Sequence, residues 1–294
     1  MRHRTLGSIS LLIKSNYFLF KLFRYPLVLL NYYKKKATTI VDLSWQKRIE
    51  DVIDSLDNRE IERVDNAGEI KGDVQIMHNG IRIHVGSYYG DGMTALVHKN
   101  RGVHEPEEEK CFSKVLTYMP EGAIMLELGA FWGFYSMSFQ QGVKNACNYL
   151  IEPDRHAILS GMNNFRLNGF KGRFFRYNIS DRIEAGDTPS ITVDSFLKEQ
   201  AILNVNILHS DIQGFEEKML MGAVESLTNR MIDYVFISTH SHALHLRCKS
   251  ILIGHKYRVL CDSNLDETYS WDGLIVARRE ELNGPDQLVI HKRV

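Results

Sequence analysis

The chain has 294 residues, enough for one large domain or for one domain with extensions. It carries 36 Lys and Arg against 36 Asp and Glu, so no overall field attracts nucleic acid. Its four cysteines, Cys111, Cys147, Cys248 and Cys261, lack Cys-x-x-Cys spacing. This pattern argues against a metal knuckle or a disulfide framework, and it favours reduced thiols in the cytoplasm.

The first 41 residues contain no Asp or Glu and alternate apolar stretches with basic residues. Lys14, Lys21 and Arg24 interrupt the apolar run too often for a membrane-spanning helix. No small-residue cleavage site follows, so we do not expect a signal peptide. Two interpretations stay open: a helix that lies on an anionic membrane surface, or a helix packed on its own domain or on a second copy of the chain in a homo-oligomer.

Residues 42–103 form the second predicted segment. Apolar residues at near-helical intervals predict an amphipathic helix over 42–64. Val74, Ile76, Ile81, Ile83 and Val85 then alternate with polar residues around an Asn-Gly turn, which predicts a β-hairpin. Residues 88–92 are expected to form a loop. This small β element could cover one side of a cleft.

A third segment, residues 104–294, begins with another helix. Pro106 and three glutamates, Glu107 to Glu109, suit a helix N-terminus, where free N–H groups favour negative charge. We expect these glutamates to be solvated. Phe112 and Val115, with Leu116 and Met119, give the buried face.

Strand and helix patterns alternate from 124 to 277, which predicts an α/β sheet covered on both faces. Strands are expected at 125–128, 148–151, 174–177, 205–208, 234–238, 256–260 and 271–277. Helices are expected from 134, over 155–167, from 192, over 215–227 and up to 252. Asp194 is expected to cap its helix.

The stretch 125–136 organises this segment. A short apolar strand ends at Gly129, and Gly133 leads into a helix. The spacing is G-x-x-x-G, without the middle glycine that lets backbone approach a pyrophosphate. Glu152 follows the next strand, close to the roughly 20-residue spacing at which an acid binds ribose hydroxyls. A ligand with ribose and adenine but no pyrophosphate fits, and S-adenosylmethionine is the common one; the alternative is a plain strand–helix turn.

Four strings in this order resemble the FkbM family of S-adenosylmethionine-dependent methyltransferases. They are ELGAFWGFYS (127–136), IEPDRHAILSGMNNFRLNG (151–169), ITVDSFL (191–197) and LHSDIQGFEEKMLMGA (208–223). The resemblance covers roughly 105–277 and implies a class I, Rossmann-like methyltransferase fold and O-methylation of sugars or secondary metabolites. The chain departs from the family at Glu127, where Asp is commoner, and at Ser210 and Gln213, where Lys and Glu are commoner.

The candidate cofactor-binding residues come from the glycine loop, from the acid that follows the next strand, and from the ends of the later strands. They are Glu127, Gly129, Ala130, Phe131, Gly133, Glu152, Pro153, Asn178 and Asp211. Asn178 is a candidate for the adenine edge, although a simple turn explains it equally well. For Glu127, the resemblance implies that it holds the loop and the methionine moiety, and the alternative is a purely structural hydrogen bond. Helices like the one after Glu105 flank the cofactor in similar methyltransferases, which makes Glu105 a further candidate.

The candidate catalytic residues are Asp211 and His240, because each follows a strand that ends at the expected pocket. Methyl transfer to oxygen needs a base, and either side chain could accept the proton. His240, His242 and His245 also allow a metal site, but no local carboxylate completes a metal signature, so we expect none.

The resemblance therefore implies an O-methyltransferase, and we expect it to act on a sugar hydroxyl of a glycan or glycolipid. The alternatives are methylation of a small secondary metabolite and a protein that binds S-adenosylmethionine without catalysis. No basic patch interleaved with aromatic residues lies near the motifs, so a nucleic-acid substrate is not expected.

Overall fold

The computed structural model describes residues 43–293. The chain divides into two units, Met1–Val41 and Asp42–Val294, and the predictions for residues 1–41 fall outside the described part. Within residues 43–293, no helix combines the length and apolar character that a membrane crossing requires. The predicted boundary between 103 and 104 stays a prediction, since both sides of it belong to the second unit.

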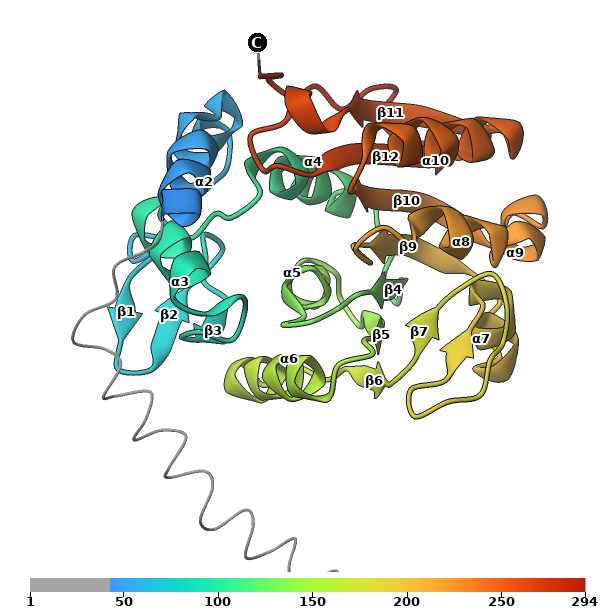
Figure 1. Ribbon diagram of the computed structural model, residues 1–294, viewed down its shortest axis with the longest axis horizontal. Helices are drawn as coiled ribbons and strands as arrows, with labels where there is room; N and C mark the ends of the chain where they lie inside the picture. Colours follow the sequence, from blue (N-terminus) through green and yellow to red (C-terminus); the bar gives the residue numbers. More distant parts are fainter. Residues whose placement is uncertain (1–42, 294) are drawn as a thin grey trace, which may run out of the picture. The chain divides into compact units, whose positions relative to one another are not determined.

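A seven-stranded sheet forms the centre of this unit (Figure 1). In spatial order its strands are β11 (Tyr257–Ser263), β12 (Gly273–Arg279), β10 (Ile232–Thr239), β9 (Val205–Ser210), β4 (Ile124–Leu128), β5 (Cys147–Ile151) and β6 (Arg173–Phe175). Neighbours from β10 to β6 pair in parallel, whereas β12 is antiparallel to both β10 and β11. The predicted α/β sheet is confirmed, and all seven strands form where the apolar runs predicted them to within a few residues.

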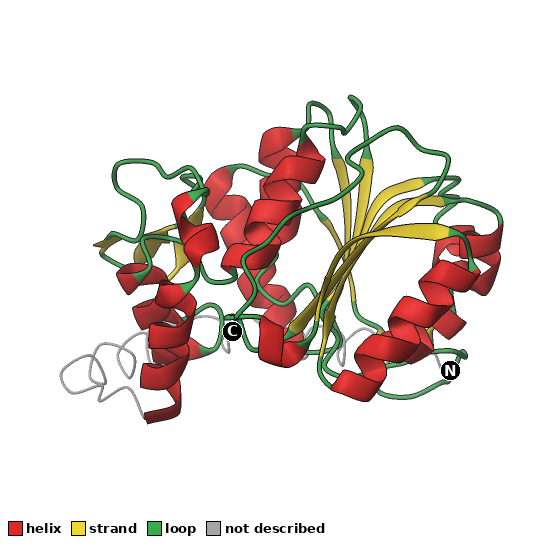
Figure 2. Cartoon of the chain, turned by 90° about the horizontal axis from the view of Figure 1, so that it is seen from above, coloured by secondary structure: helices red, strands yellow, loops and turns green. Residues whose placement is uncertain are grey.

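Helices cover both faces of the sheet, as Figure 2 shows edge-on. One face carries α4 (Pro106–Leu116), α5 (Phe134–Gly142) and α6 (Arg155–Asn168), and the other carries α7 (Val193–Glu199), α8 (Glu216–Met221), α9 (Val224–Thr228) and α10 (His242–Gly254). Side chains alternate between the faces along each strand. Leu126 and Leu128 join the apolar core under α7 to α10, while Glu127 between them faces α5 and bonds to its first turn.

The N-terminal part of the unit contains α2 (Leu43–Asp54), the 3-10 helix η1 (Leu56–Arg59), the small sheet of β1 (Ile70–Lys71), β2 (Val74–Ile76) and β3 (Arg82–His84), and α3 (Gly90–Lys99). The predicted hairpin is confirmed, since Val74 pairs with His84 and Ile76 with Arg82 around the Asn-Gly turn. The loop predicted at 88–92 is partly wrong, because α3 begins at Gly90. The buried side chains of α3, Met93, Leu96 and Val97, all come after residues 88–92, so the sequence of these five residues alone indicated a loop.

Two details of the other face also differ from the predictions. The helix predicted over 215–227 is broken into α8 and α9 at Gly222, where a Cβ atom would lie 2.4 Å from the carbonyl oxygen of Ser180. Asp194 does not cap its own helix, which Thr192 caps. Its carboxylate instead accepts the backbone N–H groups of Glu225 and Ser226, at the start of α9. The remaining elements are the ribbon of β7 (Asn178–Ile179) with β8 (Ser190–Ile191) and the 3-10 helix η2 (Leu265–Glu267).

The first turn of α4 is buried, so the prediction of a solvated helix start is wrong. Glu107, Glu108 and Glu109 are at most 5% exposed. Their partners come from separate parts of the chain: Glu107 binds Tyr269 and Ser270, Glu108 binds His209 and Ser238, and Glu109 contacts His78 and His104. A helix N-terminus favours acidic residues whether water or protein groups surround them. The local sequence pattern therefore could not distinguish a solvated first turn from a buried one.

His104 lies between two carboxylates inside this cluster. Its Nδ1 is 2.6 Å from Glu109 and its Nε2 is 3.2 Å from Glu105. Burial lowers the pKa of His104, but the two carboxylates more than offset burial and raise that pKa to about 10. Burial likewise raises the pKa of Glu105, but the imidazolium outweighs it and lowers that pKa to about 2. His104 is therefore a buried cation at neutral pH.

Replacing His104 by Gln should leave two buried carboxylates without their counter-charge. We expect a loss of about 3–5 kcal/mol in the free energy of unfolding. A raised histidine pKa contributes stability fully below its unfolded value of 6.5, and this contribution is lost as pH rises through about 10. The difference between wild type and His104→Gln, measured by urea denaturation, should therefore shrink from pH 6 to pH 10.

His84→Gln is the matched control, because His84 contacts Asp73 in an exposed pair. Its cost should stay below about 1 kcal/mol. A His104→Gln loss that is small, or that does not change with pH, would show that the buried cluster is not charged as described.

Candidate functional site

The carboxyl ends of β4, β5 and β9 meet at the point where the strand order of the sheet reverses. β4 lies between β5 on one side and β9 on the other, and ligands of open α/β sheets bind at such a switch point. The loop after β4 passes close to the end of β9. A Cβ atom on Gly129 would lie 1.8 Å from the carbonyl oxygen of Asp211, and the φ angle of Gly129 is +73°. Only glycine permits this approach.

A cavity of about 630 Å³ opens at this edge of the sheet, within the range of roughly 300–1,000 Å³ typical of small-molecule sites. Six of the predicted residues line it: Gly129, Phe131, Glu152, Pro153, Asn178 and Asp211. The structure thus brings together the loop after β4, the acid after β5 and the residues that follow β6 and β9.

Glu152 joins the cavity to the glycine loop. One carboxylate oxygen accepts the backbone N–H of Phe131 (3.1 Å), and the other accepts that of Asp154 (2.9 Å). The side chain is mostly buried, and burial raises its pKa against the effect of these two N–H groups. Each oxygen can accept a further hydrogen bond, so Glu152 can hold the loop and still bind a ribose hydroxyl pair.

The other four predicted residues, Glu127, Ala130, Gly133 and His240, are not among those that line the cavity. Ala130 is buried behind it, and Gly133 caps α5 in a left-handed conformation. Glu127 points away, and its carboxylate accepts the N–H of Ser136 at 3.1 Å. Burial raises the pKa of Glu127 to about 7, although the charge of His209 opposes this.

His240 is surrounded by carboxylates at the edge of the cavity. Its Nε2 is 3.2 Å from Asp211 and 3.6 Å from Asp272, and its Nδ1 is 2.9 Å from Glu216. Burial lowers its pKa, but these groups outweigh burial and raise the pKa to about 10. This geometry favours His240 as a cation that holds the carboxylates, and its predicted role as a base stays a prediction.

Asp272 was missed by the sequence reasoning, which looked for polar residues after strands. Asp272 precedes β12, but β12 is antiparallel to β10, and Gly273 pairs with Thr239. The start of β12 therefore lies beside the end of β10. Burial raises the pKa of Asp272 to about 7, although the charge of His240 opposes this. Asp272 could have been found only by recognising that β12 is antiparallel to β10.

Tyr88 and Tyr89 were also missed, because they belong to the N-terminal part of the unit. Both line the cavity. They follow the hairpin directly, and no spacing rule links them to the motifs beyond residue 125.

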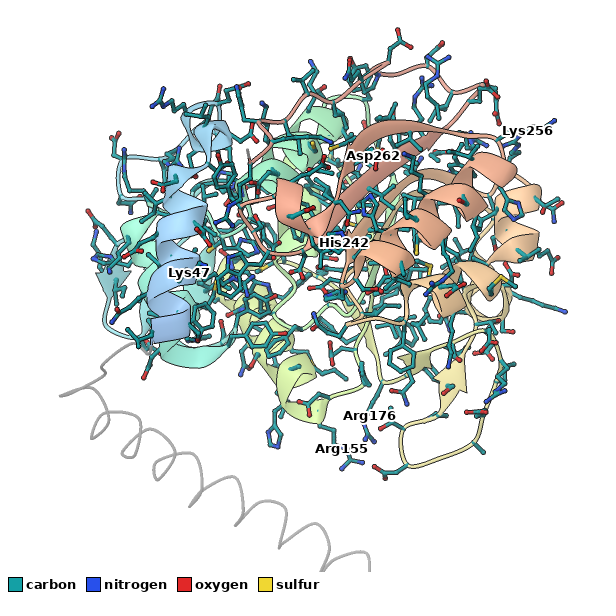
Figure 3. The ribbon with its side chains drawn as sticks, turned by 45° about the horizontal axis from the view of Figure 1, so that its top comes forward. Lys47, Arg155, Arg176, His242, Lys256 and Asp262 are labelled. Atoms are coloured by element: carbon teal, nitrogen blue, oxygen red, sulfur yellow. The ribbon has the colours of Figure 1, made fainter. Side chains whose placement is uncertain are left out.

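The three histidines that allowed a metal site do not converge. Figure 3 labels His242 on the first turn of α10 and Asp262 on β11. His242 is exposed, 3.9 Å from Asp266, whereas His245 is buried and contacts Thr239 and Asp262.

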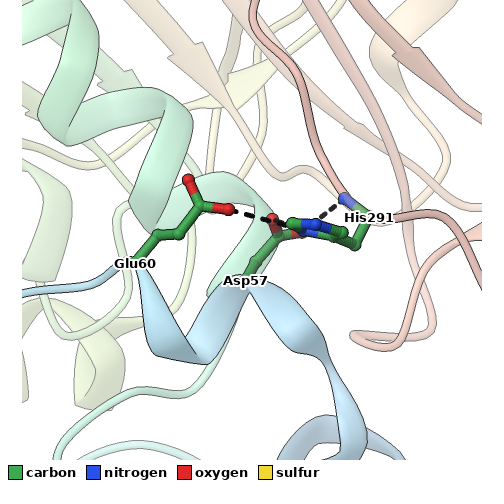
Figure 4. Close-up of side chains that lie close together, drawn as sticks. All are labelled: Asp57, Glu60 and His291. Atoms are coloured by element: carbon green, nitrogen blue, oxygen red, sulfur yellow. Dashed lines mark hydrogen bonds and ion pairs between the residues drawn. The ribbon is translucent and has the colours of Figure 1, made fainter.

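Among residues 43–293, one cluster has metal-ligand spacing: Asp57, Glu60 and His291 (Figure 4). The ammonium group of Lys110 lies 2.7 Å from Asp57 and 2.8 Å from Glu60. The backbone N–H of His291 also donates to Asp57 at 2.9 Å. A cation of the protein thus already neutralises these carboxylates, and the cluster anchors the C-terminal tail to η1.

The sequence comparison agrees with this geometry. Residues 84–259 match the family described as the Methyltransferase FkbM domain. The chain belongs to the FkbM methyltransferase family. As a member of it, the chain is an S-adenosylmethionine-dependent methyltransferase with the class I fold. No curated protein gives a significant match.

Several solved methyltransferase structures are similar to this FkbM methyltransferase at low identity. Precorrin-6y C5,15-methyltransferase from Geobacter metallireducens GS-15 is 11% identical, with a TM-score of 0.42 over 59% of this chain and 87% of that chain. A SAM-dependent methyltransferase from Aquifex aeolicus is 14% identical, with a TM-score of 0.40 over 60% and 94%. TrmK from M. capricolum, in complex with S-adenosyl-homocysteine, is 15% identical, with a TM-score of 0.39 over 59% and 71%.

The cavity of the FkbM methyltransferase fits S-adenosylmethionine in size and in chemistry. Glu152 and Asp211 both line it; Glu152 would accept hydrogen bonds from the ribose hydroxyls, and Asp211 would pair with the ammonium group of the methionine moiety. When bound, the cofactor supplies an activated methyl group on a positively charged sulfur.

Glu152→Gln tests the ribose contact, because it removes the charge and keeps the shape. Charge-assisted hydrogen bonds contribute about 1.5–3 kcal/mol, so we expect S-adenosylmethionine to bind roughly 10- to 100-fold more weakly by isothermal titration calorimetry.

Glu121→Gln, an exposed acid that precedes β4 and pairs with Lys144, is the control and should bind normally. Unchanged affinity in Glu152→Gln, with an unchanged melting temperature, would remove Glu152 from the binding site.

Proposed function

We propose that this S-adenosylmethionine-dependent methyltransferase transfers its methyl group to a sugar hydroxyl of a glycan or glycolipid. The observation that carries the proposal is the group of Asp211, which lines the cofactor cavity, with His240 and Asp272 directly behind it. Two carboxylates that lie at the same nitrogen of a protonated imidazole can orient a hydroxyl group and take its proton, which is what O-methylation requires.

The members of this group, and Glu216 in contact with His240, have distinct roles in the proposal. Glu216 is fully buried, and its Oε1 accepts the N–H groups of Ile212 and Gly214 and contacts His240. It therefore fixes the loop after β9. His240 holds Asp211 in place, and Asp211 orients the hydroxyl group or the methionine end of the cofactor.

Asp272 is the proposed base, in place of His240. Its carboxylate lies 3.6 Å from His240, too long for a hydrogen bond. Asp211, by contrast, also accepts a hydrogen bond from Gln213 at 2.9 Å. With a pKa of about 7, Asp272 can accept the proton that the hydroxyl group loses as its oxygen gains the methyl group.

The lining of the cavity supports a polyhydroxylated acceptor. Tyr177 and Phe215 offer aromatic surface to the apolar faces of a sugar ring, and Glu184 and Asp211 offer hydrogen-bond acceptors. The titratable groups of the lining include three acids, Glu152, Glu184 and Asp211, and two bases, Arg182 and Lys218. Such a surface does not favour a phosphate backbone, so a nucleic-acid acceptor is not proposed.

Mass spectrometry of glycans and glycolipids from cells with and without the protein tests the acceptor class. We expect one species to lose a single methyl group when the protein is absent. Extracts of the deleted cells, incubated with purified protein and a methyl-labelled donor, should regain the label on that species. Label on a small soluble metabolite would favour the secondary-metabolite alternative, and binding without any transfer would favour a non-catalytic protein.

Asp272→Asn tests the base in the same labelling assay. General-base catalysis contributes about 10²–10⁴-fold, so methyl transfer should fall within that range while S-adenosylmethionine affinity stays within about twofold. Wild-type activity should decline as pH falls through about 7, because the base acts in its ionised form.

Asp286→Asn is the control, since Asp286 is exposed and pairs with Arg258. An Asp272→Asn protein with normal turnover and a normal pH profile would exclude Asp272 as the base.

A further inference from the structure

The β-hairpin is seated on α6 by two asparagines one helical turn apart. Asn168 accepts the backbone N–H of Arg82 at 2.9 Å and donates to its carbonyl oxygen at 2.7 Å. Asn164 accepts the N–H of His84 at 2.9 Å. These side chains form hydrogen bonds with the edge of β3 that does not pair with β2. Helix α6 therefore fixes the position and direction of the segment that follows the hairpin.

Asn164 extends this connection to the glycine loop. Its amide group, fully buried, donates to the carbonyl oxygen of Trp132 at 3.1 Å and to the hydroxyl of Ser87 at 3.3 Å. One side chain therefore binds the end of the hairpin, the segment after it and the loop that forms the cofactor site. The segment 85–89 is part of this site.

The rings of Tyr88, Tyr89 and Phe131 form what we call the aromatic wall. Tyr88 stacks on Trp132 at 4.4 Å with an interplanar angle of 7°, and it meets Phe131 edge-on at 5.0 Å. Tyr89 lies 5.4 Å from Phe131 and is 47% exposed, whereas Tyr88 is 8% exposed. Tyr88 is thus the support of the wall, and Tyr89 presents a ring to the cavity.

Two residues of the wall adopt left-handed backbone conformations. The φ angle of Tyr89 is 43° and that of Phe131 is 37°. Bulky side chains rarely adopt this region, and such outliers persist where the surroundings over-determine them, often at ligand sites. These two residues have rings in contact with each other, which indicates that the placement of the rings here outweighs the preference of the backbone.

The order of the strands tells which end of the cofactor meets the wall. Glu152 follows β5 and is placed for the ribose, and Asn178 lies beyond β6, on the side away from β4. Asp211 follows β9, on the opposite side. Burial, followed by the charge of Asp211, raises the pKa of Tyr89, so the wall lies within the field of that carboxylate. Tyr89, Phe131 and Asp211 also line the same cavity, so the methionine end of a bound cofactor, which carries the sulfonium, would lie toward Asp211 and the wall.

We infer that the ring of Tyr89, backed by Tyr88 and Phe131, covers the sulfonium of S-adenosylmethionine and distinguishes it from the uncharged sulfur of S-adenosylhomocysteine. Aromatic faces attract cations more strongly than they attract neutral thioethers. The wall would thus favour the methyl donor and help release the product. This inference rests on the cofactor of the family and not on the proposed sugar acceptor, so neither depends on the other.

Calorimetric titration of the full chain with the two compounds tests the inference, because it needs no acceptor. In Tyr89→Leu, S-adenosylmethionine should bind about fivefold to tenfold more weakly. Binding of S-adenosylhomocysteine should change by less than about twofold, which also shows that the variant is folded. Tyr89→Phe keeps the ring and should keep the preference of the wild type.

Tyr118→Leu is the matched control, since Tyr118 is 43% exposed and lies after α4, away from the cavity. It should bind both compounds normally. Equal weakening of both compounds in Tyr89→Leu would overturn the inference, because the ring would then contribute only packing. Unchanged binding of both would overturn it too, and so would a lost preference in Tyr89→Phe, which would assign the effect to the hydroxyl group.

Discussion

The buried carboxylates of α4 are the interaction on which the rest of the structure depends. Three consecutive glutamates, Glu107 to Glu109, leave the same helical turn toward different parts of the chain: the segment before β12, the sheet, and the N-terminal hairpin region. Burying charge is unfavourable unless partners satisfy it, so each glutamate specifies one docking partner. A single helix turn thereby sets the position of the hairpin region and of the segment that carries Asp272, and both contribute to the edge of the cofactor cavity.

The cofactor cavity and the proposed base beside it are brought together by the topology of the sheet more than by sequence motifs. Parallel strands deliver Gly129, Glu152 and Asp211 at their carboxyl ends, where sequence spacing alone can find them. The antiparallel β12 delivers Asp272 at its amino end, and no rule that scans the residues after a strand can detect it. Asp211 and Asp272 both lie at the Nε2 atom of His240, where their carboxylates would repel each other, and the charge of the imidazolium makes their proximity tolerable.

Much of the fold was predictable because its signals are local. Apolar runs closed by glycine predicted the strands, and the Asn-Gly turn predicted the hairpin. The fate of Glu107 to Glu109 was not predictable, because a helix N-terminus accepts acids in water and in a core alike, and their partners lie up to 163 residues away. The start of α3 was missed for a related reason: Tyr89 enters it in a left-handed conformation that the surrounding packing imposes and that its sequence does not favour.

The same packing explains why the hairpin region cannot be regarded as a separate cover. A mobile lid would have few buried contacts with the body of the protein. Here Asn164 bonds at once to His84, Ser87 and Trp132, and His78 contacts Glu109 in the buried cluster of α4. Opening the hairpin would strip a fully buried amide and a buried carboxylate of their partners, at a cost comparable to a large fraction of the stability of a domain. The aromatic wall is therefore present before any ligand arrives, and the strain at Tyr89 and Phe131 is compensated by contacts that exist in the free protein. A preformed wall needs no ordering when the cofactor binds, so the interactions of its rings are available for affinity and for the choice between charged and neutral sulfur.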